Sequence, residues 1–219
     1  MNKRNLIAVA ITAGLFAATF LDAQGILEVS SLGETPTVSQ SLGSDFWIAQ
    51  EFVIEYGNPN SYALNSIQLD MNPSSGTPTG FTVSLYSGGF SPADDLGALT
   101  GSDPSAGGVF AYTPTSAMTL SAGFYYLVVT SATPIGVGAY NWVATTSPRV
   151  TQMGSWYIDD AYYTSTDGSS WNGSVRNGLF EMAIYATPAP EPSSLWLLFV
   201  GGSLFVSRRF FTKAIVRDC

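Results

Sequence analysis

The sequence has no histidine, and its only cysteine is the last residue, Cys219. Without histidine, a Ser-His-Asp or Cys-His catalytic site and the usual zinc and copper ligand sets are excluded. Without a second cysteine the body cannot form an internal disulfide, and export without disulfides suits a bacterial surface better than a small secreted eukaryotic scaffold. Only carboxylate, hydroxyl and carbonyl chemistry is left. We therefore expect no cofactor, apart from the calcium considered below.

Basic residues are almost as scarce in the body of the chain. Between Gln24 and Thr187 there are two, Arg149 and Arg176, against thirteen acidic residues, which gives a formal charge of −11. A surface this acidic repels phosphate backbones and cannot replace the counterions condensed around DNA or RNA. Nucleic acid is therefore excluded as a partner.

The first residues follow the order of a secretory signal peptide. Lys3 and Arg4 precede an apolar run, which leads through Leu21 and Asp22 to the small residue Ala23. This order predicts a signal peptide at residues 1–23, cut by signal peptidase between Ala23 and Gln24. The alternative is an uncleaved anchor, although the apolar run is shorter than the ~20 residues that a membrane span needs.

The body, residues 24–186, alternates between apolar and polar residues in short segments separated by Gly, Pro, Ser and Asn. Residues 67–71 and 81–85 each place every second side chain, all apolar, on one face. The segment 124–130 is apolar throughout and predicts a central strand covered on both sides. About nine or ten strands without intervening helices indicate an all-β fold, an antiparallel β-sandwich with jelly-roll-like connections.

Tyr125 lies at the entrance of that central strand. The spacing from Leu120 to Tyr125 is typical of a tyrosine corner, in which the phenol bonds back to backbone a few residues upstream. We therefore interpret Tyr125 as a structural residue.

The chain after the body has three parts. Residues 187–194 are rich in proline, which disfavours both helix and sheet and predicts a stiff linker. Residues 195–207 are apolar or small and predict a short transmembrane helix, which can span by thinning the bilayer or by letting flanking arginines reach the interface. Residues 208–219 are basic and predict a cytoplasmic tail. The acidic body is then outside the membrane.

Pro190, Glu191 and Pro192, followed by an apolar helix and the pair Arg208 and Arg209, resemble the PEP-CTERM sorting signal of Gram-negative bacteria. The resemblance implies that an exosortase recognises the proline–glutamate–proline motif and cleaves the tail in the membrane, while the arginines hold the helix in place. The protein would reside transiently in the inner membrane and then at the cell surface or outside the cell. The alternative is an ordinary tail anchor that is never cut.

The body itself is similar to the choice-of-anchor R domain. The resemblance is carried by residues 47–52, 62–67, 81–86 and 167–171. The name of that family refers to one domain type that is joined to different surface anchors. No catalytic residue is implied by the resemblance.

Aromatic residues gather in one part of the sequence, at Trp156, Tyr157, Tyr162, Tyr163 and Trp171. Exposed rings beside amides and hydroxyls bind sugars through apolar contact and directed hydrogen bonds. The same residues at a period of two also fill the core of a sandwich, and this reading is the simpler one. Alternation places Trp156 on one face and Tyr157 on the other. Carbohydrate binding by Trp156, Tyr157, Tyr163 and Trp171 stays as an alternative.

Three acidic residues near this aromatic group are candidates for calcium. Asp159, Asp160 and Asp167 could add carboxylates to loop carbonyls, since calcium takes six to eight oxygen ligands. The spacing of an EF-hand is absent. Acidic side chains that face solvent are the alternative.

A glycoside hydrolase needs two facing carboxylates, at ~5 Å or at ~6.5–9.5 Å. The pairs that could supply them are Glu51 with Glu55, Asp94 with Asp95 and Asp159 with Asp160. Glu51 and Glu55 alternate onto the face of Val53, which we expect to be an outer, solvated face. This reading places both charges in water rather than in an active site.

These patterns predict a non-enzymatic, exported protein of the bacterial surface or extracellular matrix that is an exosortase substrate. Its expected partners are signal peptidase, the membrane before processing and the exosortase. The alternative function is a module that binds exopolysaccharide, and a weaker third is a hydrolase with paired carboxylates.

Overall fold

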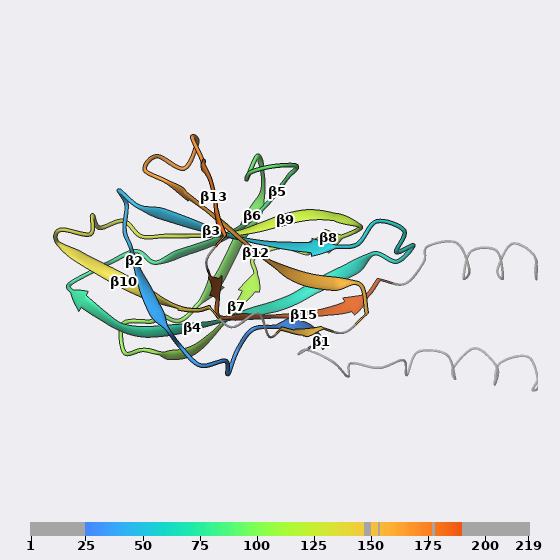
Figure 1. Cartoon of the computed structure of the whole chain (residues 1–219), viewed down its shortest axis with the longest axis horizontal. Helices are drawn as coiled ribbons and strands as arrows, with labels where there is room; N and C mark the ends of the chain where they lie inside the picture. The colour runs from blue at the N-terminus through green and yellow to red at the C-terminus, as the bar shows by residue number, and fades with distance from the viewer. Residues whose placement is uncertain (1–24, 147–149, 153, 177, 190–219) are drawn as a thin grey trace, which may run out of the picture. The chain divides into compact units, whose positions relative to one another are not determined.

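The computed structural model describes residues 25–146, 150–152, 154–176 and 178–189 (Figure 1). These residues form fifteen strands and no helix. The strands are β1 (Ile26–Ser30), β2 (Val38–Leu42), β3 (Trp47–Ile54), β4 (Tyr62–Gly76), β5 (Thr82–Gly88), β6 (Asp94–Gly101), β7 (Gly108–Pro114), β8 (Thr119–Leu120), β9 (Gly123–Thr130), β10 (Gly138–Thr145), β11 (Thr151–Gln152), β12 (Trp156–Ser165), β13 (Asn172–Arg176), β14 (Leu179–Phe180) and β15 (Met182–Pro188). The prediction of an all-β fold is confirmed, and the larger number of strands reflects several two-residue pairings.

The chain divides into two compact units, Met1–Thr187 and Pro188–Cys219. The strands belong to the first unit, apart from the last residue of β15. The predicted signal peptide with its cut at Ala23 and Gln24, and the predicted sorting signal with Pro190–Pro192, Arg208 and Arg209, lie outside the described residues. Within the described part of the chain, no helix has the length and hydrophobicity to cross a membrane.

Most strands join into one continuous, curled antiparallel sheet. Its order is β11-β1-β15-β4-β7-β6-β5-β9-β3-β12-β13, with β10 pairing with β2, β4 and β14. Strand β9 pairs with β3 on one side and β5 on the other, as the partners Phe52↔Tyr125 and Leu85↔Leu127 show. The prediction that residues 124–130 form a central strand is therefore confirmed.

The curl encloses one main core between strands that are far apart in the sheet order (Figure 1). On one side, Phe52 of β3 stacks between Tyr125 and Trp156, with ring centroids 5.4 and 6.0 Å away. On the other side, Trp142 of β10 packs on Phe180 at 4.5 Å. Such aromatic pairs add stability beyond the area that they bury. The fold is thus sandwich-like, with large rings filling the space between the layers.

The predicted alternation of faces is confirmed on two strands. Ile67, Leu69 and Met71 of β4 all point into the core, as do Val83 and Leu85 of β5. Every second residue of a strand lies on the same face, so an alternating segment needs only one covered side to fix its orientation.

Gln50 is a polar residue on the core face of β3, and its side chain is fully buried. Its Nε2 donates to the carbonyl oxygens of Asp159 and Ala161 at 2.7 and 3.1 Å, and its Oε1 accepts from the backbone N–H of Phe180 at 3.0 Å. The first two groups belong to β12 and the third to β14. One amide therefore ties three strands together inside the core.

The tyrosine corner predicted at Tyr125 is confirmed. Its hydroxyl donates to the carbonyl oxygen of Ser121 at 2.8 Å and accepts from the N–H of Ser121 at 3.0 Å. The phenol therefore closes the turn before β9 and fixes where the central strand begins.

The first and last long strands of the domain are neighbours. Strand β1 pairs antiparallel with β15, and Ile26 lies opposite Ala186. The chain consequently enters and leaves the domain along adjacent strands.

Replacing Tyr125 with Phe is expected to destabilise the domain by about 1 kcal/mol, because both hydrogen bonds to Ser121 are lost while the ring stays packed. The measurement is urea unfolding followed by intrinsic fluorescence. Tyr56→Phe is the control, since the Tyr56 side chain is 74% exposed and its hydroxyl is free to bond with water. Equal midpoints for the two variants would contradict the structural role of the corner.

Candidate functional site

A second apolar cluster covers the outer face of strands β5, β9, β3 and β12. Its buried members are Ala49, Tyr126, Val128, Ala161 and Tyr163, and half-buried rings at its edge are Trp47, Tyr86, Phe124 and Trp171. This cluster lies on the opposite side of the sheet from the main core, because its residues alternate with core residues along each strand. The outer face is therefore largely apolar.

The cluster corrects one prediction. Glu51 was expected to be solvated, but it is only 5% exposed. It lies opposite Tyr126 on β9, and the Tyr163 hydroxyl donates to its Oε2 at 3.2 Å. Glu55, at the end of the same face, is exposed as predicted. The prediction for Glu51 was wrong because alternation identifies the face but not what covers it.

The two tyrosines beside Glu51 remain protonated. Burial raises the pKa of Tyr126 and of Tyr163, and the negative charge of Glu51 raises both further. A phenol that keeps its proton at neutral pH acts as a hydrogen-bond donor. Tyr163 and Glu51 thus form a structural polar contact inside an apolar cluster.

The aromatic residues predicted as a sugar platform are split between faces. Trp156 is 1% exposed and packs in the main core, and Tyr163 is buried in the outer cluster, so neither ring is available to a ligand. Their assignment to a binding surface was wrong, and for Trp156 the core interpretation holds. Tyr162 packs against Phe180 at 5.1 Å. Of the predicted residues, only Tyr157 and Trp171 keep half-exposed rings at the outer face.

The acidic residues considered for calcium are also separated. Asp160 is exposed at an irregularity of β12 between Ile158 and Tyr162. Asp167 Oδ1 accepts from Ser165 Oγ, Ser169 N and Ser170 N at 2.8–3.0 Å, which lowers the pKa of Asp167 and closes a local turn. Among the described residues, no three acidic side chains gather as a metal site. Calcium at these positions therefore receives no support.

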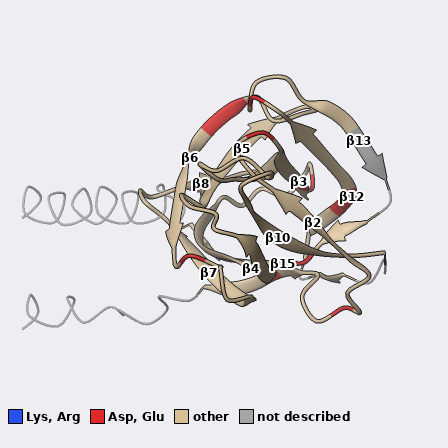
Figure 2. Ribbon diagram, turned by 90° about the vertical axis from the view of Figure 1, so that its left-hand side faces the viewer, with Lys and Arg blue, Asp and Glu red and all other residues tan. Residues whose placement is uncertain are grey.

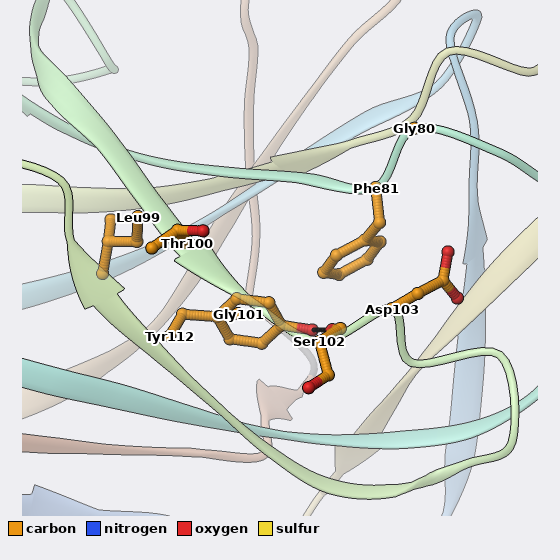
Figure 3. A pocket seen from close by; sticks show the side chains of 8 residues that line it. All are labelled: Gly80, Phe81, Leu99, Thr100, Gly101, Ser102, Asp103 and Tyr112. Carbon is orange, nitrogen blue, oxygen red and sulfur yellow. Dashed lines mark hydrogen bonds between the residues drawn. The ribbon is translucent and has the colours of Figure 1, made fainter.

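A different place, which the sequence did not point to, has the shape of a binding site. Where β5 begins and β6 ends, a pocket of about 260 Å³ opens beside β7 (Figure 3). Its lining residues are Gly80, Phe81, Leu99, Thr100, Gly101, Ser102, Asp103 and Tyr112. Leu99 and Tyr112 are buried and form the floor, whereas the segment from Thr100 to Asp103 is exposed and forms a rim.

Hydrogen bonds fix the polar groups of this pocket. Asp103 Oδ2 accepts from the Tyr140 hydroxyl at 2.6 Å, and Oδ1 accepts from Ser105 N at 3.0 Å. The Tyr112 hydroxyl donates to the carbonyl oxygen of Ser102 at 3.1 Å, the bond drawn in Figure 3. Burial and the nearby Asp103 raise the pKa of Tyr112 and of Tyr140, so both stay protonated donors. The carboxylate is therefore held in one orientation beside an aromatic ring.

The sequence carries only a weak signal for this pocket. Gly80-Phe81 and Gly101-Ser102-Asp103 are two glycine-containing segments about twenty residues apart, and such segments are common in loops. A Cβ on Gly101 would lie 2.5 Å from a ring carbon of Tyr112, so only glycine leaves room for that ring. Even this constraint becomes visible only when β6 and β7 are placed side by side.

Figure 2 shows acidic residues (red) on several strands and loops around the domain. The acidic residue Glu181 is 1% exposed, and its Oε1 has no hydrogen-bond partner among the described residues. Burial raises the pKa of Glu181, as does the nearby Asp70, whereas the N–H of Gly33 lowers it. Burial also raises the pKa of Asp70 and of Glu28. The buried Glu181 and Glu28 and the half-buried Asp70 therefore cost stability when they are ionised.

Replacing Glu181 with Gln is expected to stabilise the domain at neutral pH. The folded-state pKa of Glu181 lies above the ordinary 4.5, so between the two values the folded chain holds more protons than the unfolded chain. The free energy of unfolding then falls as pH rises through this window, and the cost persists above it. Glutamine removes the charge with little change in shape.

Urea unfolding at pH 4 to 8 measures this effect, with Glu55→Gln on an exposed residue as the control. Glu181→Gln should raise the midpoint at neutral pH and flatten its pH dependence. A lower midpoint for Glu181→Gln than for the parent at neutral pH would contradict this prediction. It would mean that the hydrogen bond from the N–H of Gly33 to the carboxylate stabilises the domain more than burial of the charge destabilises it.

The comparisons with known proteins do not extend this picture. No protein-family model matches the sequence. A comparison with curated proteins finds no match either. The likeness to the PEP-CTERM signal and to the choice-of-anchor R domain therefore depends on the residues quoted above.

Proposed function

We propose that the chain is an exported protein of the bacterial surface or extracellular matrix, without enzymatic activity, that an exosortase sorts through a PEP-CTERM signal. In this proposal a β-sandwich with jelly-roll-like connections lies between a cleaved signal peptide and a transmembrane sorting helix. Signal peptidase and exosortase are its processing enzymes. The membrane holds the chain only until the tail is cut.

The observation that carries the proposal is the order of elements at the C-terminus. Strand β15 ends at Pro188, and Pro190, Glu191 and Pro192 follow directly, before the apolar segment and the pair Arg208 and Arg209. A membrane protease needs an extended, accessible segment, and proline-rich chain cannot continue a sheet ladder. The last described strand thus ends just before the motif that would be recognised.

The place where the chain enters and leaves the domain gives further support. Because Ile26 lies opposite Ala186, the start of β1 and the end of β15 are side by side. The chain therefore enters and leaves the domain at the same end of two adjacent strands. The strands that lie between them in the chain, β2 to β14, do not carry these connections. This arrangement suits a protein whose task is to present a surface.

The positions of the carboxylates favour binding over hydrolysis. Glu51 is buried under Tyr163 while Glu55 faces solvent, so the two do not flank a common space. The pocket in Figure 3 is lined by a single acidic residue, Asp103. Acid–base hydrolysis of a glycosidic bond requires two carboxyl groups across the substrate.

The proposal predicts the mass of the protein recovered from the surface and medium of its native host. The mature chain should lack residues 1–23 and everything after about Pro192. Replacing Pro190, Glu191 and Pro192 together with Ala should leave the tail attached and the protein in the membrane fraction, because the recognition motif is gone. Intact mass spectrometry reads both ends at once.

Ser193→Ala with Ser194→Ala is the matched control, since it alters the same linker and leaves the motif in place. This variant should be processed like the parent. A parent chain that keeps Leu195 to Cys219 would mean an ordinary tail anchor, and the exosortase proposal would be withdrawn.

A second candidate function is binding of exopolysaccharide by the outer face. Trp171 is half-buried against the outer cluster and Tyr157 is half-exposed beside it, so each leaves part of a ring to solvent. Trp171→Ala is expected to weaken retention on immobilised host polysaccharide about tenfold, ~1.4 kcal/mol. Phe90→Ala, which removes a 94% exposed ring that is not part of the outer cluster, is the control. Unchanged retention by a folded Trp171→Ala protein would exclude this face.

A further inference from the structure

We propose that the pocket lined by Phe81 and Asp103 binds a single neutral sugar ring. The source of that ring, a polysaccharide at the cell surface, rests on the proposed function, whereas the recognition of the ring rests on the pocket alone. This site is separate from the outer face that carries Trp171. Its lining comes from the two residues before β5, from the end of β6 and the two residues after it, and from β7.

The size of the pocket fits one ring. Ligand pockets for drug-sized molecules occupy ~300–1,000 Å³, and this pocket holds about 260 Å³. Its floor is buried at Leu99 and Tyr112, and its rim is exposed from Thr100 to Asp103. A sugar ring can enter from solvent with one edge toward this floor, while the remainder of the polysaccharide stays outside the pocket.

Phe81 supplies the apolar contact. Its ring is half-buried and extends into the space between the rim and Tyr112 (Figure 3). It packs edge-to-face on Tyr140 at 4.8 Å and tilted on Tyr112 at 5.6 Å. Two neighbours therefore fix its orientation, and the remaining surface of the ring can contact the C–H face of a sugar.

Asp103 supplies the directed polar contact. Its two carboxylate oxygens each accept one hydrogen bond from the protein, from Tyr140 and from Ser105. An ionised carboxylate has about four acceptor positions, so each oxygen retains one for a ligand. Two adjacent sugar hydroxyls can donate to such a pair. Because the carboxylate is already oriented, little conformational freedom is lost on binding.

The charge of the lining selects the ligand. Among the described residues that line the pocket, Asp103 is acidic and none is basic, and Thr100 and Ser102 add only neutral hydroxyls. A uronic acid, a phosphate or a sulfated sugar would place an anion beside this carboxylate, and like charges repel in a partly desolvated site. The geometry therefore favours a neutral hexose over an acidic one.

The test is two-dimensional ¹H–¹⁵N NMR of the purified full-length chain in a sugar-free detergent. The probes are the methyl glycosides of glucose, galactose and mannose, with glucuronic acid as the acidic comparison. The backbone amides of Gly80 and Gly101 report on the pocket directly. At least one neutral glycoside should shift them in a saturable manner, and glucuronic acid should not.

Two variants connect the shifts to the proposed contacts. Asp103→Asn should weaken binding about tenfold, because hydrogen bonds to a charged acceptor are replaced by neutral ones. Phe81→Leu should weaken it about fivefold through loss of the ring face. Asp94→Asn changes an exposed acid at the beginning of β6, far from Asp103, which follows the end of that strand, and it should bind like the parent.

Four results would overturn the site: no saturable shift with any neutral glycoside, equal affinity in Asp103→Asn and Asp94→Asn, no loss of affinity in folded Phe81→Leu, or loss of binding in Trp171→Ala alone. Urea unfolding of each variant identifies any that fail to fold. The sorting proposal is read from the mass of the host protein, so it can fail while the sugar site holds, and the reverse.

Discussion

The packing of β3, β12 and β14 around the core depends on the hydrogen bonds of one buried side-chain amide. Gln50 lies among apolar residues on the core face of β3, where an unpaired amide would be costly. Its side chain uses both ends, donating to the carbonyl oxygens of Asp159 and Ala161 and accepting from the N–H of Phe180. The carbonyls belong to a stretch of β12 that leaves the regular ladder. Gln50 thereby replaces the missing ladder bonds between β3 and β12, and it also connects β14 to β3.

That irregular stretch also determines the outer face. Ile158 pairs with Phe52 and Tyr162 pairs with Gln50, so three residues of β12 lie opposite the single residue Glu51. The extra residues carry Asp160 into solvent and bring Tyr163 over the carboxylate of Glu51. A bulge redirects side chains in this manner without changing the strand order. The contact between Tyr163 and Glu51 and the exposure of Asp160 thus have one common cause.

The features that sequence predicted are those set by neighbours in the chain. Alternation placed Ile67, Leu69 and Met71 in the core, and a five-residue spacing identified the corner at Tyr125. The features that it missed depend on contacts between distant segments. Glu51 and Tyr163 are 112 residues apart, and Asp103 and Tyr140 are 37 apart. No local pattern reports such a pairing, because it appears only when the sheet curls and the register is fixed.

The separation of strands also bears on how sorting and binding relate. Strands β1 and β15, which connect the domain to the rest of the chain, are separated in the sheet from β5, β6 and β7 by β4. The Phe81 and Asp103 pocket is therefore built by strands that do not carry the connections. Its polar groups are fixed by Tyr140 and Ser105, within the domain itself. These contacts do not involve the tail, so the proposed sugar site would have the same geometry in the membrane-attached precursor and in the released protein of the proposed sorting route.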